Sequence, residues 1–223
     1  MISKQNDNLD TSNRDLQITL AKGILGEFPL GSLIGDLVGE IIPKQRMDRL
    51  VDYARRLNEK IISLEQEIDS LKVDDDFIDL IEESFIHAAR AKTEDRREYI
   101  VNIVKNGIED DTVEFIESKY LLGLLSEIND IEILWLKSFT FRYKGEGAEF
   151  LELHNEVLKP IALYNSSTAE DIKKGTLQLS YKEHLDRLGL AKAKYNTRMS
   201  GYEELVSCEI TLLGKMLLKN IGV

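Results

Sequence analysis

The chain has 223 residues, of which 43% are hydrophobic and 31% are charged, and its mean hydropathy is -0.24. This balance excludes a disordered or fibrous protein and is typical of a folded globular chain of one large domain or two small ones. Forty acidic against 29 basic residues give a net charge of -11, which repels phosphate backbones and disfavours a nucleic-acid partner. Only three prolines interrupt runs rich in Leu, Ile, Glu, Lys and Ala, so we expect a mainly α-helical fold.

Two further features bear on the cellular compartment. The single cysteine, Cys208, excludes an internal disulfide and a zinc site built from cysteines, and is compatible with a reducing cytoplasm. The N-terminus lacks the apolar core of a secretory signal, and no run of about 18 uncharged apolar residues occurs. We therefore expect a cytoplasmic protein, with contact at the inner face of the membrane as an alternative.

The first 43 residues divide into a flexible leader, 1–14, and a glycine-rich helical hairpin, 15–43. Gly31, Gly35 and Gly39 recur every fourth residue, and this spacing lets helices approach closely in membranes as well as in soluble bundles. Several charged residues would be costly at bilayer depth, namely Lys22, Glu27, Asp36 and Glu40. Three interpretations stay open: a soluble hairpin packed on the protein, conditional membrane contact, and a hairpin that binds a partner.

A long heptad helix follows at the start of the second region, 44–144. Apolar residues alternate at spacings of three and four through Met47, Leu50, Ala54, Leu57, Ile61, Leu64, Ile68 and Leu71. This pattern is typical of a coiled coil. We expect self-association through a seam of Leu57, Ile61, Leu64 and Ile68, or else an antiparallel partner helix within the same chain.

The rest of this region predicts a helical bundle. One helix should bury a stripe that comprises Phe77, Leu80, Ile81, Phe85, Ala88 and Ala89. Thr93 is placed to cap the next helix, which should face inward through Tyr99, Ile100, Ile103, Val104 and Ile108. Asp111 with Glu114, and Asn129 with Glu132, have the spacing of capping boxes that begin two more helices.

The third region, 145–223, begins where Gly145 and Gly147 permit a turn. We expect a helix that ends at Gly189, a strand, a loop, a second strand, and a last helix that begins at Thr211. This order is that of a winged-helix-like α+β module. Its basic residues Lys182, Arg187, Lys192 and Lys194 are candidates for contact with DNA, but acidic residues lie among them: Glu183, Asp186, Glu203 and Glu204.

We find no signature of catalysis. The three histidines, His87, His154 and His184, lie far apart and lack the spacing of metal-binding motifs. Phosphate-binding loops and nucleophile motifs do not occur either. We expect no cofactor, no metal and no catalytic residue, and hence a protein that is not an enzyme.

Four segments carry a resemblance to a known family: "LIGDLVGEIIPKQRMDRLVDYARRLNEKI", "DIEILWLKSF", "HLDRLGL" and "ITLLGKMLLKNI". In these segments the chain resembles the bacterial abortive-infection alpha family and similar phage-defence proteins, over about residues 30–223. Its architectural marks are the glycine-rich entry into a long helix and the Thr211 and Gly214 pair that opens the last helix. The resemblance implies an intracellular antiviral role and assigns no catalytic residue.

The function that we expect is therefore non-enzymatic bacterial defence through self-association and through contacts with proteins or a membrane. The partners would be a second copy of the chain, another protein, or a membrane surface, whereas nucleic acid is disfavoured. Two alternatives remain. One is a winged-helix transcriptional regulator, and the other is a soluble protein-interaction scaffold.

Overall fold

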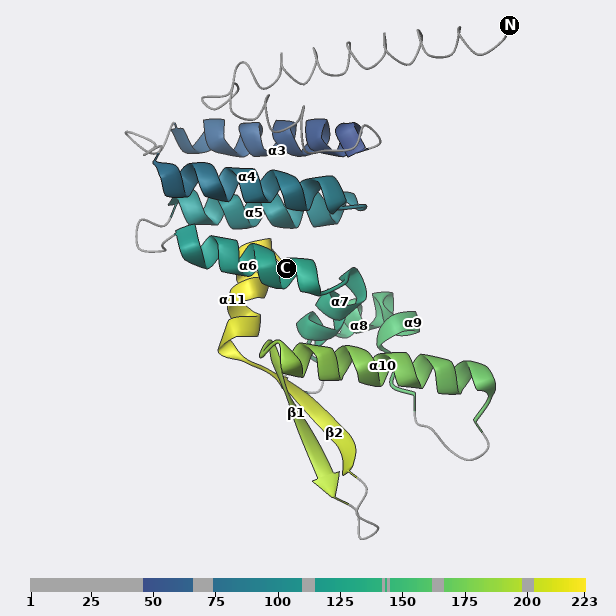
Figure 1. Ribbon diagram of the computed structural model, residues 1–223. Helices are drawn as coiled ribbons and strands as arrows, with labels where there is room; N and C mark the ends of the chain where they lie inside the picture. Colours follow the sequence, from purple (N-terminus) through teal and green to yellow (C-terminus); the bar gives the residue numbers. More distant parts are fainter. Residues whose placement is uncertain are drawn as a thin grey trace, which may run out of the picture. The chain divides into compact units, whose positions relative to one another are not determined.

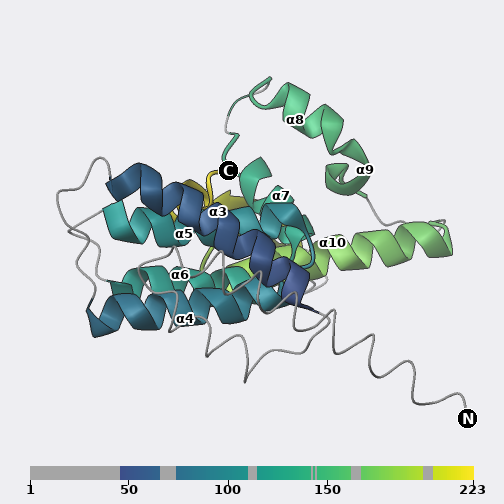
Figure 2. The same cartoon turned by 90° about the horizontal axis from the view of Figure 1, so that it is seen from above.

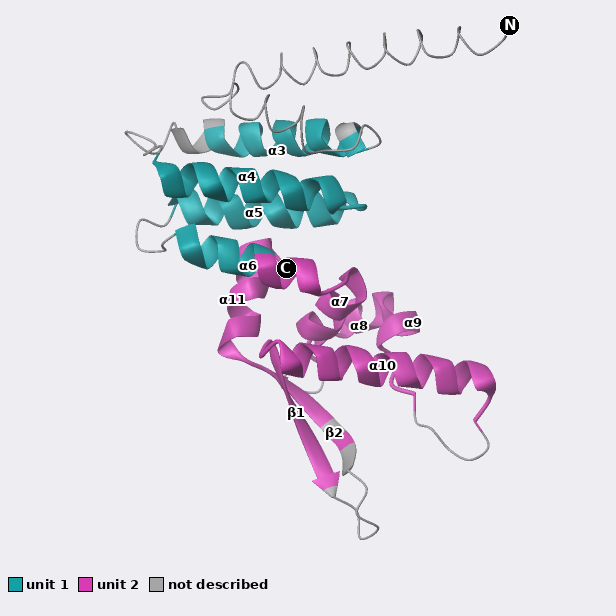
Figure 3. Cartoon of the chain, viewed as in Figure 1, with its two compact units in different colours: residues 1–122 teal, residues 123–223 magenta. Residues whose placement is uncertain are grey.

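The computed structural model describes residues 46–65, 74–109, 115–141, 143, 145–161, 167–197 and 203–223. These residues form nine helices and one antiparallel sheet of two strands near the C-terminus (Figure 1). The predicted fold class, mainly α with a small α+β module, is confirmed. The chain divides into two compact units, residues 1–122 and 123–223 (Figure 3).

Unit 1 consists of α3 (Met47–Glu65), α4 (Asp75–Arg90), α5 (Glu94–Glu109) and the first part of α6 (Phe115–Glu127). Helices α3, α4 and α5 pack against one another side by side (Figures 1 and 2). Their shared core contains Tyr53 and Phe85, whose rings meet edge to face at 5.0 Å. The predicted stripe of α4, from Phe77 to Ala89, is buried as expected.

The heptad seam of α3 faces this core. Leu50, Ala54, Leu57 and Ile61 are all buried by their own chain. Within the described half of the seam, therefore, the intramolecular alternative accounts for the apolar repeat, and Leu57 and Ile61 present no surface to a second copy. The side chain of Leu64, residue Ile68, and the three hairpin glycines Gly31, Gly35 and Gly39 lie outside what the structure describes.

Local capping sets where the helices of unit 1 begin. The Asp74 side chain accepts a hydrogen bond from the backbone N–H of Phe77 and caps α4. Thr93 Oγ1 accepts one from Arg96 N at 3.2 Å and caps α5, as predicted. The capping box expected at Asp111 and Glu114 lies outside the described residues.

The first part of α6 joins this bundle through α4 and α5. The Phe115 ring lies 5.8 Å from the Phe77 ring, and Gly107 of α5 leaves room for the buried Ser118. A Cβ at Gly107 would collide with the Ser118 hydroxyl, so this glycine serves close helix approach.

Unit 2 comprises the end of α6, α7 (Asp130–Ser138), α8 (Ala148–Leu153), α9 (Asn155–Leu158), α10 (Ala169–Arg187), β1 (Ala191–Thr197), β2 (Glu203–Ile210) and α11 (Leu212–Ile221). Helix α7 packs against α9, α10 and α11. The division between the units falls between Leu122 and Gly123, so α7 belongs to unit 2. We had expected the boundary near residue 145, after α7.

The predicted order of helix, strand, strand and helix is present in unit 2. Strands β1 and β2 pair from Ala191 opposite Ile210, with a register shift between Lys194 and Tyr195 that marks a β-bulge. Gly189, at φ 71°, ends α10 in the left-handed conformation and turns the chain into β1. The predicted turn near Gly145 and Gly147 is also present, with φ values of 95° and 63°.

The Thr211 and Gly214 pair connects the start of α11 with the start of β1. Thr211 Oγ1 accepts a hydrogen bond from Gly214 N at 3.0 Å and donates to the carbonyl of Gly189 at 2.7 Å. A Cβ at Gly214 would collide with the Leu190 carbonyl oxygen. The pair therefore lies where α10, the two paired strands and α11 meet.

Candidate functional site

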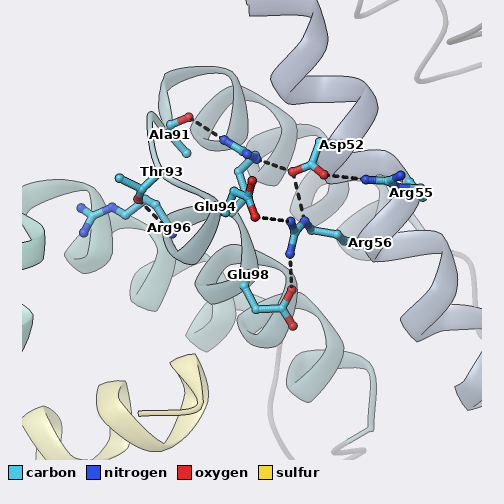
Figure 4. A network of polar contacts seen from close by, with 9 residues as sticks. Asp52, Arg55, Arg56, Ala91, Thr93, Glu94, Arg96 and Glu98 are labelled. Carbon is cyan, nitrogen blue, oxygen red and sulfur yellow. Dashed lines mark hydrogen bonds and ion pairs between the residues drawn. The ribbon is translucent and has the colours of Figure 1, made fainter. Parts of the chain in front are cut away.

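A largely buried polar network in unit 1 connects α3 with α5 (Figure 4). The Asp52 carboxylate accepts hydrogen bonds from the guanidinium groups of Arg97, Arg56 and Arg55. Burial raises the pKa of Asp52, but these hydrogen bonds outweigh it and hold the pKa below its ordinary value. Asp52 is therefore ionised at neutral pH.

Two more carboxylates extend the network along α5. Arg56 Nη2 lies 3.3 Å from a carboxylate oxygen of Glu94, and Arg56 Nη1 lies 3.3 Å from one of Glu98, as the dashed lines of Figure 4 show. Arg97 also donates to the carbonyl of Ala91, which follows α4. Because every charge meets an opposite charge or a carbonyl, this network holds the bundle together and offers no reactive group.

Unit 2 holds a second polar pair at the junction of α7 and α10. The buried Glu132 carboxylate has one oxygen 2.7 Å from His184 Nδ1, while its other oxygen accepts from Asn129 N at 2.8 Å. The latter bond belongs to the predicted capping box, which is confirmed. Both oxygens are thus engaged, so the pair joins α7 to α10.

Trp135 and Lys182 form the next contact of the same junction. The Lys182 ammonium lies 4.3 Å from the centroid of the Trp135 ring, a cation–π geometry. Burial lowers the pKa of Lys182, while the nearby Cys208 opposes this shift. The indole N–H of Trp135 is buried and has no partner among the described residues.

The four candidate DNA contacts differ in their burial and in the side chains that they contact. Lys182 is half-buried over Trp135, and Lys194 forms an ion pair with Glu209 of the neighbouring strand. Arg187 and Lys192 are exposed. The structure thus leaves two of the four cations without a partner inside the described part of unit 2.

The surface of unit 2 is instead rich in exposed apolar side chains. Helix α8 has no buried residue, and its Leu153 is 77% exposed. Helix α10 exposes Ile172, Leu177 and Leu179, and α11 exposes Leu212. In the described residues of unit 1, the exposed large apolar side chains are Ile116 and Tyr120 on α6. Exposed apolar side chains mark a contact surface where they form one contiguous patch, whereas scattered ones are ordinary.

Regular apolar periodicity does not predict these exposed residues. In α8, for example, Phe150 and Leu153 are three residues apart and share a helical face, yet Leu153 is exposed. The Glu132 and His184 pair had no signal, because 52 residues separate its members.

Each of the three histidines contacts a different side chain. His87 lies 3.6 Å from Glu83 on the same helix, and the His154 ring lies 4.6 Å from the Phe150 ring at a tilt of 58°. No group of three metal-ligating side chains comes together in the ranges that the structure describes. Over the same ranges, no helix has the length and apolarity needed to cross a bilayer.

No protein-family model, curated protein or solved structure matches the chain.

Proposed function

We propose that the protein is a non-enzymatic bacterial defence protein that acts through contacts with proteins, a second copy of itself included, and that unit 2 makes these contacts. The observation that carries the proposal is the set of exposed apolar side chains on α8, α10 and α11. Apolar groups surrounded by polar ones are typical of protein interfaces. The defence role comes from the resemblance to the abortive-infection alpha family.

The charges of unit 2 favour protein over nucleic acid as the partner. Residues 123–223 carry 13 basic and 14 acidic residues, which is no footprint for a phosphate backbone. Lys182 lies over the Trp135 ring, and Lys194 forms an ion pair with Glu209. Lys174 forms an ion pair with Glu170. Binding of a protein partner, by contrast, requires neither a positive electrostatic field nor unpaired cations on unit 2.

The test replaces exposed leucines and measures protection of bacteria against phage. The double variant Leu153→Gln and Leu177→Gln should lose protection while it accumulates and unfolds like the wild type, because both side chains face solvent. Ile116→Gln, which alters an exposed apolar residue of unit 1, is the matched control and should protect fully. Full protection by the double variant would overturn the proposal.

A winged-helix transcriptional regulator is the second candidate. The order α10, β1, β2 and α11 favours it, since a helix followed by a hairpin is the core of that module, and the exposed Arg187 and Lys192 flank its turn. This candidate requires duplex binding that weakens steeply as salt rises. Failure to shift a mixed-sequence duplex at about 150 mM salt would exclude general DNA binding at physiological ionic strength.

A further inference from the structure

Two surfaces of unit 2 have opposite charge and similar apolar character. The first, which we call the basic face, is the exposed side of α11. Leu212 and Met216 are one helical turn apart, as are Lys215 and Lys219, and all four side chains are exposed. Residues 211–223 contain no Asp or Glu, so α11 itself places no acidic side chain beside these two lysines.

The second surface, which we call the acidic face, is formed by α8 and α9. Residues 146–158 contain four glutamates and no Lys or Arg. On α8, Glu149 and Glu152 are exposed beside the exposed Leu151 and Leu153. Leu158 is the only buried residue of these two helices, whereas Leu151 is 37% exposed and Leu153 is 77% exposed.

Four charged side chains of these faces form no ion pair with any residue that the structure describes, namely Lys215 and Lys219 of the basic face and Glu149 and Glu152 of the acidic face. Figure 1 shows α7 between α11 and the two short helices, and α7 packs against both α9 and α11. The basic face of one copy therefore does not neutralise the acidic face of the same copy.

We infer that two copies of the chain associate through reciprocal docking of the basic face of one on the acidic face of the other. A two-fold axis would form this contact twice, so the two contacts together would have to supply the roughly 1,200–2,000 Å² that stable interfaces bury. Leu212 and Met216 would bury against Leu151 and Leu153, while lysines meet glutamates at the rim. This inference rests on the proposed function and names the partner and the surface.

Charge reversal and mixing test this inference on the full chain. One variant carries Lys215→Glu with Lys219→Glu, and the other carries Glu149→Lys with Glu152→Lys. Each variant alone should self-associate at least about tenfold more weakly than the wild type by light scattering, because like charges then oppose each other. A mixture of the two variants should associate like the wild type, since both contacts of a mixed pair recover opposite charges. Arg187→Glu with Lys192→Glu, also exposed in unit 2, should leave association unchanged.

The outcomes separate this inference from the proposed function. Wild-type association that both reversals leave intact, or that mixing fails to restore, would overturn the docking of these two faces and leave self-association through another surface. A wild-type chain that stays monomeric at every concentration would overturn the inference as well. The phage assay on the double leucine variant would then decide whether contacts with a different protein carry the function.

Discussion

Substituting Asp52 with Asn tests whether the polar network holds α3 to α5. The substitution keeps the size of the side chain but removes the charge that faces three guanidinium groups. Arg97, only 8% exposed, loses its carboxylate partner and keeps the Ala91 carbonyl. We expect the free energy of unfolding of unit 1 to fall.

The magnitude follows from burial. Breaking a buried ion pair by removal of one partner costs about 3–5 kcal/mol. Here the Asp52 side chain is 18% exposed, and the bond to the largely exposed Arg55 contributes little. Because Arg97 keeps one hydrogen bond and the Asn oxygen still accepts, we expect a loss of about 2 kcal/mol.

Hydrogen exchange of the α3 and α5 amides, together with urea unfolding followed by circular dichroism, measures this loss. Glu59→Gln is the matched control, since Glu59 is exposed on the same helix and forms no ion pair with a described residue; it should change stability by less than about 0.5 kcal/mol. Equal stability of the Asp52→Asn variant and the wild type at neutral pH would refute the reasoning.

The lowered pKa of Asp52 predicts how the loss of stability in Asp52→Asn depends on pH. The pKa of Asp52 is lowered in the folded state, so its contribution is fully present above the unfolded value of about 3.9 and is lost as pH falls through the folded pKa. The difference in unfolding free energy between the wild type and Asp52→Asn should therefore stay constant near neutral pH and shrink below about pH 4. A difference that grows on acidification would contradict this sign.

Three further predictions concern packing and the glycine-rich hairpin. Tyr53→Phe should leave stability unchanged or raise it by up to about 1 kcal/mol in urea unfolding, because the buried Tyr53 hydroxyl makes no well-formed hydrogen bond in the described residues and the nearby Ser84 hydroxyl already donates to the Ile81 carbonyl. A clear loss of stability would show that the contact with Ser84 is a stabilising hydrogen bond. Gly107→Ala should destabilise unit 1 by about 1–3 kcal/mol through the clash with Ser118. By contrast, a Cβ at Gly123 in α6 meets open space, so Gly123→Ala should raise helix stability by about 0.5–1 kcal/mol. Thermal unfolding of both variants compares these effects, and equal effects would contradict the packing described for Gly107. If the glycine-rich hairpin that the sequence predicts enters lipid, Gly35→Leu should abolish the liposome flotation and leakage of the wild-type chain. Unchanged flotation of the variant would contradict that interpretation.

Local features of the fold were predictable from sequence because they depend on neighbouring residues. The buried stripe of α4 follows from helical periodicity, and the caps at Thr93, Asn129 and Thr211 follow from the spacing of a cap and the helix it begins. The end of α10 at Gly189 was predictable for the same reason, since a glycine in the left-handed conformation commonly ends a helix.

Features that depend on distant contacts were not predictable. Asp52 and Arg97 are separated by 45 residues, and nothing in a single sequence marks them as partners. The heptad seam was compatible with a second copy or with the same chain, and only the burial of Leu57 and Ile61 distinguishes these choices. The exposure of Leu153 and Leu177 likewise depends on what the rest of unit 2 leaves uncovered.

Sedimentation velocity of the purified full chain over a wide range of concentrations tests the central claim most directly, because self-association is the simplest protein contact that unit 2 could make. We predict a mass above the 25.5 kDa of one chain that increases with concentration, and a shift toward that single-chain mass when Leu153 and Leu177 are both replaced by Gln. A mass that increases equally in the wild type and in the double variant would contradict the assignment of these contacts to the exposed leucines of unit 2.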